Sequence, residues 1–153
     1  MGRMVLVKCN CGYCDERFRF GVNWSYREVK KHQTALARSG RYGMEWKNLL
    51  ASDPELLVDV ELHLYQCPRC HQLFSEYRMD LYKSLHDDGF YYVPSEEEIL
   101  YHYKHLCPNC KKLMTRIPLS QQHGLVGINN SEELVICPKC GDTAIAEFCG
   151  WTD

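Results

Sequence analysis

Long hydrophobic runs are missing from this sequence. No stretch of apolar residues approaches the roughly 18–20 that a transmembrane helix needs. The N-terminal stretch MGRMVLVKCNCGYC also lacks the apolar core and the small-residue cleavage site of a secretory signal peptide. We therefore expect a cytoplasmic protein that has no contact with a membrane.

An excess of charge of one sign is missing as well, because the formal net charge of the 153 residues is -2. This balance disfavours generic binding to phosphate backbones, which depends on an excess of Lys and Arg. The hydrophobic share of 45% is that of a globular chain rather than a disordered one. We therefore expect a folded protein that does not bind nucleic acid through overall charge.

Cysteine, in contrast, is abundant, with ten residues in the chain. Cytosolic reductants keep free thiols reduced, so ten cysteines without an export signal indicate metal thiolates rather than disulfides. Eight of the cysteines form four C-x-x-C pairs, and residues that favour β-strands stand on both sides of each pair. The pairs are Cys11 and Cys14, Cys67 and Cys70, Cys107 and Cys110, and Cys137 and Cys140.

Each pair can supply half of a metal site. A C-x-x-C turn between two strands points both sulfurs at one ion, and two such turns complete a tetrahedron. A thioredoxin-type dithiol is disfavoured, because it needs its first cysteine at a helix N-terminus and the residues after Cys70 alternate like a strand. The sequence therefore predicts two four-cysteine sites with two Zn²⁺ ions per chain, and Fe is the less favoured occupant.

The sequence leaves open which pairs share an ion. Loop closure favours the third pair with the fourth, because the connection between them is the shortest, and then joins the first pair to the second. The nested alternative joins the first pair to the fourth and the second pair to the third. Cys9 could replace Cys11 as a ligand, whereas Cys149 is expected to be a small buried apolar residue.

The segment CPKCG at 137–141 resembles the knuckles of the zinc-ribbon and rubredoxin-like families. That motif uses a glycine after the second cysteine for a left-handed turn residue, and Gly141 stands at this position. Asp15, His71 and Lys111 follow the other three pairs. The resemblance implies an α+β fold with two zinc-ribbon-like modules built from four C-x-x-C β-hairpins.

Between the first and second pairs, residues 25–57 are predicted to be a helical insertion within a single compact unit of residues 1–153. Amphipathic spacing and capping residues predict helices at about 26–39 and 43–51. Gly40 is placed to end the first of them.

A further short helix is predicted before the third pair. Ser95 and Glu98 form a capping-box pattern, in which each side chain caps the backbone of the other residue. The apolar and aromatic residues that follow extend the expected helix to about 95–105.

An enzyme is not expected. Catalytic zinc sites keep an open coordination position, whereas four complete cysteine pairs indicate closed sites. Neither H-E-x-x-H nor the deaminase pattern of H-x-E followed by P-C-x-x-C occurs in the sequence. The chemistry expected of the cysteines is therefore structural.

The favoured function is a binding, adaptor or regulatory module with structural zinc and a protein partner. Each tetrathiolate site would add a double negative charge, which places nucleic acid behind protein as the partner. The alternatives are a rubredoxin-like iron electron carrier and a nucleic-acid-binding zinc-ribbon protein that uses the basic 27–47 segment. The basic residues expected to contact a partner are Arg27, Lys30, Lys31, Arg38 and Arg41.

Overall fold

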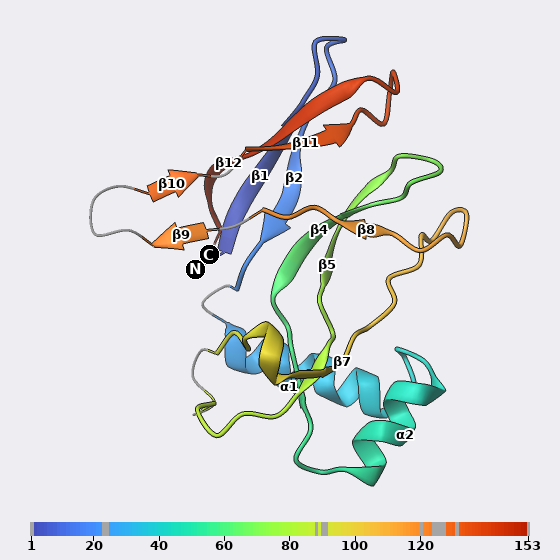
Figure 1. Ribbon diagram of the computed structural model, residues 1–153, viewed down its shortest axis with the longest axis vertical. Coiled ribbons are helices and arrows are strands. Elements are labelled where there is room, and N and C mark those ends of the chain that lie inside the picture. Colours follow the sequence, from blue (N-terminus) through green and yellow to red (C-terminus); the bar gives the residue numbers. More distant parts are fainter. Residues whose placement is uncertain are drawn as a thin grey trace. The chain divides into compact units, whose positions relative to one another are not determined.

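Figure 1 shows the computed structural model, which describes residues 2–22, 25–87, 89, 92–119, 121–123, 128–130 and 132–152. Contacts between residues divide the chain into two compact units. The first unit contains Met1–Asn23, Leu62–Glu76 and Lys104–Asp153, and the second contains Trp24–Glu61 and Tyr77–Tyr103. The expectation of one compact unit over 1–153 stays a prediction.

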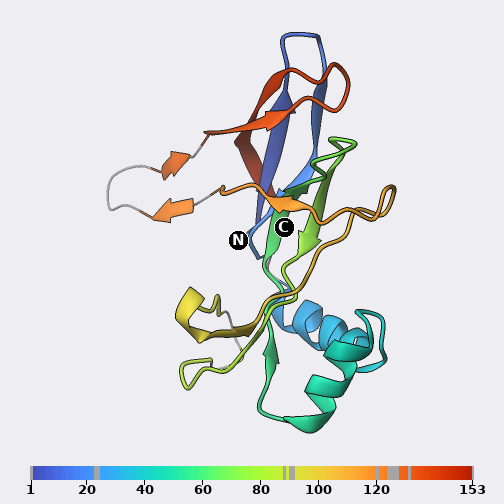
Figure 2. The same ribbon diagram turned by 45° about the vertical axis from the view of Figure 1, so that its right-hand side comes forward.

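The first unit contains a four-stranded antiparallel sheet with the strand order β11-β12-β1-β2. Two hairpins from opposite ends of the chain form it, and β1 pairs with β12 along its length. Figures 1 and 2 show that the turns of the two hairpins lie at the same end of the sheet. The strands are β1 (Gly2–Lys8), β2 (Cys14–Phe20), β11 (Glu132–Ile136) and β12 (Thr143–Thr152).

A second, three-stranded antiparallel sheet of the first unit has the order β5-β4-β8. Its strands are β4 (Leu62–Gln66), β5 (Leu73–Tyr77) and β8 (Thr115–Arg116). A separate two-stranded hairpin is formed by β9 (Gln121–His123) and β10 (Ile128–Asn130). Every described strand pairing of this unit is therefore antiparallel.

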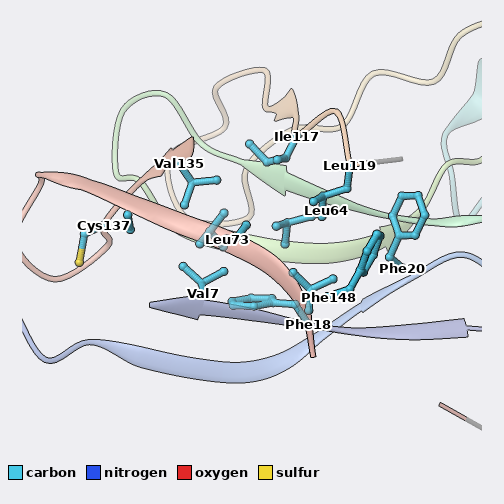
Figure 3. Packing of buried hydrophobic residues seen from close by; sticks show 13 residues of the cluster. Val7, Phe18, Phe20, Leu64, Leu73, Ile117, Leu119, Val135, Cys137 and Phe148 are labelled. Atoms are coloured by element: carbon cyan, nitrogen blue, oxygen red, sulfur yellow. The ribbon is translucent and has the colours of Figure 1, made fainter. Parts of the chain in front are cut away.

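The core of the first unit lies between its two larger sheets. Alternation along β1 turns Val5 and Val7 to the buried face, and both side chains are fully buried. Figure 3 shows Val7 and Phe148 facing Leu64 across the core. The two hairpin pairs therefore share one hydrophobic core, which also includes the ligand candidate Cys137.

The second unit contains the two α-helices of the described chain, α1 (Tyr26–Arg38) and α2 (Met44–Ser52). Gly40 has a φ of 94°, and the N–H of Arg41 donates to the carbonyl of Leu36, as in a Schellman cap. Both helices predicted for the insertion are confirmed to within about one residue at each end. Among the described residues, no helix has the length and apolar character needed to cross a membrane.

The helix predicted at 95–105 is wrong. The capping box of Ser95 and Glu98 is present, but it starts only a 3-10 turn, η1 (Glu96–Glu98). Strand β7 (Ile99–Tyr101) follows and pairs with β6 (Leu81–Tyr82), which pairs in turn with β3 (Leu57–Val58). Pairing with β6 and burial of Ile99 have overridden the local helix signal.

Candidate metal centres

The first centre brings together cysteines from the two hairpin turns of the four-stranded sheet. Cys9 and Cys11 follow β1, and Cys137 and Cys140 follow β11. The Sγ atoms of Cys9 and Cys140 are 3.6 Å apart, and those of Cys11 and Cys137 are 3.7 Å apart. All four sulfurs lie within 4.8 Å of one another.

The second centre lies at the three-stranded sheet. Cys67 and Cys70 form the turn between β4 and β5, and Cys107 and Cys110 precede β8. The Sγ atoms of Cys67 and Cys110 are 3.1 Å apart, and those of Cys70 and Cys107 are 3.6 Å apart. These four sulfurs also lie within 4.8 Å of one another.

In both clusters the four sulfurs lie close enough together to surround one tetrahedral ion. A metal–sulfur bond of about 2.3 Å in a tetrahedron separates neighbouring sulfurs by about 3.8 Å. A disulfide would bring them to about 2.0 Å, and all ten cysteines are free thiols. Each cluster can therefore hold one metal ion, although this spacing suits zinc and iron alike.

Three of the four turns share one backbone conformation. The residue after the second cysteine has a left-handed φ, which is 62° at His71, 60° at Lys111 and 79° at Gly141. Its N–H donates to the carbonyl of the first cysteine at 2.9–3.0 Å in all three turns. The left-handed residue reverses the chain so that both sulfurs of the turn face one point.

The first turn is one residue shorter than the others. The N–H of Gly12 donates to the carbonyl of Cys9 at 3.0 Å, and Gly12 has a φ of 96°. Gly12 therefore takes the part of Gly141, and Cys9 and Cys11 are the two cysteines of this turn. The signal was present in the sequence, because CNCG has its glycine directly after a cysteine, whereas Asp15 follows Cys14.

Seven of the eight predicted ligands lie in the clusters, and the eighth, Cys14, does not. Cys14 is the first residue of β2, is exposed and pairs with Lys8 in the sheet. The structure places Cys9, the alternative candidate, in the first cluster beside Cys11 rather than in its place. Cys149 is exposed on β12, so the prediction that it is buried is wrong.

The ligand pairs follow the nested arrangement, first with fourth and second with third. Loop closure pointed to the other arrangement, but its cost rises only slowly with loop length. Strand pairing determines which cysteine turns meet, since β1 pairs with β12 and β4 pairs with β8. The hydrogen bonds and the shared core outweigh the longer connections.

In the absence of metal, the protein stabilises one thiolate in each cluster. Burial opposes ionisation of Cys67, but the N–H groups of Cys70 and Arg69, at 3.5 and 3.4 Å from its Sγ, lower its pKa to about 6. Burial likewise opposes ionisation of Cys137, yet backbone N–H groups lower its pKa to about 7.

The last proton of each cluster is held much more tightly. The neighbouring thiol of Cys67 raises the pKa of Cys110 to about 12. The N–H of Asp142 favours the Cys140 thiolate, but partial desolvation by the surrounding cluster and the neighbouring thiols outweigh it and raise the pKa of Cys140 to about 12. Four adjacent sulfurs cannot all ionise near neutral pH without a cation to compensate their charge.

The two centres differ in solvent exposure. In the first centre Cys11 and Cys140 are exposed, while only Cys137 is buried. In the second centre Cys67 and Cys107 are buried. His105 lies beside this centre, stacks on Tyr65 at 4.0 Å between ring centroids, and places its Nδ1 2.7 Å from Glu76 Oε2. Solvent therefore reaches the first centre more easily.

The five basic residues predicted to contact a partner lie on α1 and the turn after it. Arg27, Lys31, Arg38 and Arg41 are exposed. Lys30 has a different environment, because its Nζ lies 2.5 Å from both Asp87 Oδ2 and the Tyr82 hydroxyl. Lys30 therefore has an internal role in the second unit.

No protein-family model, no curated protein and no solved structure matches the chain in the three comparisons.

Proposed function

We propose that each four-cysteine cluster holds one Zn²⁺ ion in a closed structural site and that the chain acts as a binding or adaptor module. The sulfur spacing carries this proposal. Four Sγ–Sγ distances of 3.1–3.7 Å allow the sulfurs of each cluster to surround one tetrahedral ion. They are too long for disulfide bonds, in which the sulfurs are about 2.0 Å apart. Two hairpin turns that supply one tetrahedron are also the arrangement of a zinc ribbon.

A structural role suits the small sheets of the first unit. Strand β8 has two residues and β4 has five, so the strands around the second centre bury little apolar surface by themselves. A structural zinc ion can contribute on the order of 10 kcal/mol of folding free energy. Four thiolates fill the coordination sphere, which leaves no position for a substrate or for catalytic water.

The experiment is elemental analysis of protein purified without added metal, together with a visible absorption spectrum. The proposal predicts two zinc ions per chain and no visible absorption, because Zn²⁺ has a filled d shell. Iron with thiolate charge-transfer bands would contradict it and favour the rubredoxin-like electron carrier. Less than one ion of any metal per chain would overturn the metal sites themselves.

A protein partner agrees with the charge of the loaded chain. The apoprotein has a formal charge of -2, and two tetrathiolate zinc sites make it more negative. Nucleic-acid binding through 27–47 would also lose the contribution of Lys30, which lies between Asp87 and Tyr82. The nucleic-acid alternative is therefore the less supported one.

A further inference from the structure

The turn of the second centre carries two exposed leucines. Leu106 and Leu113 form an antiparallel bridge next to the ligands, so their side chains lie on the same face. Leu106 is 52% exposed and Leu113 is 56% exposed, whereas Cys107 and Met114, the next residues along the chain, are buried. Strand alternation thus directs Cys107 toward the metal centre and the leucine pair toward solvent.

Basic residues stand beside the ligands of the same centre and close to this leucine pair in the sequence. Lys111 and Lys112 directly follow the ligand Cys110, Arg69 lies between the ligands Cys67 and Cys70, and Lys104 precedes the turn. All four basic residues are exposed. Residues 104–119 contain no Asp or Glu. We call this surface the knuckle patch, and it comprises Arg69, Lys104, Leu106, Lys111, Lys112 and Leu113.

The charge of the knuckle patch is not neutralised within the described part of the chain. None of its four basic side chains forms an ion pair with a described residue, whereas at the first centre Lys8 pairs with Glu147 at 2.5 Å. Lys111 Nζ donates only to the carbonyl of Pro108, at 3.1 Å. The four positive charges also exceed the double negative charge of a zinc tetrathiolate beneath them.

We infer that the knuckle patch docks an acidic segment of a protein partner that carries apolar side chains. This inference rests on the proposed function and specifies where its partner binds. Complementary carboxylates would pair with the basic residues, and apolar side chains would cover Leu106 and Leu113. Nucleic acid fits less well, because single-strand binders stack bases on exposed aromatic rings, whereas Tyr65 is 4% exposed and stacked on buried His105.

The test uses fluorescence anisotropy with a labelled peptide in which glutamates flank two leucines. Zinc-loaded protein should bind this peptide more tightly than a version with serines for leucines or glutamines for glutamates. The double variant Lys111→Glu/Lys112→Glu and the variant Leu106→Ser should each weaken binding by about tenfold or more. The matched control Lys31→Glu/Arg38→Glu on α1 should leave binding unchanged.

Metal analysis of every variant separates this inference from the proposed function. The surface variants should keep two ions per chain, so weaker binding would report on the patch rather than on a lost site. Equal binding by the wild type and the knuckle variants would overturn the inference. The inference would also be overturned if only the α1 control bound the peptide more weakly. Tighter binding of a labelled single-stranded oligonucleotide than of the peptide would overturn it as well.

Discussion

The side chain of Gln66 is hydrogen-bonded to the backbone of Ile136. Gln66 Nε2 donates to the Ile136 carbonyl at 2.6 Å, and the Ile136 N–H donates to Gln66 Oε1 at 3.0 Å. Ile136 ends β11, an edge strand, so the amide of Gln66 satisfies backbone groups on its open side. Gln66 precedes Cys67 and Ile136 precedes Cys137, so this contact links the two metal centres.

Replacement of Gln66 should therefore affect both centres. Gln66 is 6% exposed, so Gln66→Ala removes the buried amide that bonds the backbone of Ile136 and the carbonyl of His71, and it should cost about 1–3 kcal/mol of unfolding free energy. The measurement is the rate of metal release to a chelator, which should rise for both ions. Gln72→Ala is the control, because the Gln72 side chain is exposed. Faster release of only the second-centre ion would show that the contact does not link the centres.

The ligand set of the first centre predicts different outcomes for two neighbouring cysteines. Cys9→Ser should lower the metal content by about one ion per chain and destabilise the first unit, because Cys9 belongs to the cluster. Cys14→Ser should keep both ions, because Cys14 lies outside it. Elemental analysis measures both variants, with Cys149→Ser as a second control. Loss of an ion in Cys14→Ser with retention in Cys9→Ser would reverse the assignment.

The left-handed residue of the third turn offers a stability test. Lys111 has a φ of 60°, a conformation that costs a side-chain-bearing residue about 1–2 kcal/mol and glycine much less. Lys111→Gly should therefore raise the stability of the metal-loaded protein by about 1 kcal/mol in denaturant unfolding. Lys112→Gly is the matched control and should be destabilising, because Lys112 has no left-handed φ. The strain assignment fails if both substitutions change stability in the same direction.

Asp59 makes the second unit sensitive to pH. Burial raises the pKa of Asp59 to about 7, because the residue is only 2% exposed. The positive charge of Arg78, whose Nε is 3.7 Å from Asp59 Oδ2, lowers the pKa but does not offset the effect of burial. The folded protein therefore binds a proton that the unfolded chain releases above about pH 4. The free energy of unfolding therefore falls as the pH rises from about 4 to about 7, and the decrease due to Asp59 levels off above that range.

The variant Asp59→Asn should remove this dependence. Asn keeps an oxygen that can accept from the N–H of Glu61, as Asp59 Oδ1 does at 3.0 Å. The difference in unfolding free energy between variant and wild type should grow in favour of the variant from pH 6 to pH 7, by about 1 kcal/mol. Denaturant unfolding with both metal sites saturated measures this difference. A difference that stays constant with pH would show that Asp59 titrates normally.

The local features of the fold were largely predictable from sequence. The left-handed Gly40 and the amphipathic pattern before it defined α1, and strand-favouring residues beside the first, second and fourth cysteine pairs indicated the strands found there. The hairpin expected around the third pair is wrong, because Cys107 and Cys110 lie between Leu106 and Leu113, which form only an isolated bridge. The helix expected at 95–105 failed because Ile99 is needed in the strand β7, and a capping box specifies only how a helix begins.

The composition of the metal centres depended on information that spacing alone does not contain. C-x-x-C was the most frequent spacing and favoured Cys14, whereas the glycine after Cys11 gave the correct end of the turn. The nested pairing follows from strand pairs such as β1 with β12, which join residues more than a hundred positions apart. Such long-range pairs are fixed by the packed core and cannot be inferred from connection length.

X-ray absorption at the zinc edge of the purified, metal-loaded protein tests the central claim most directly. The account predicts a shell of four sulfurs at about 2.3 Å around the average ion, with no nitrogen or oxygen ligand. A shell with fewer than four sulfurs, completed by nitrogen or oxygen at about 2.0 Å, would contradict two closed tetrathiolate centres.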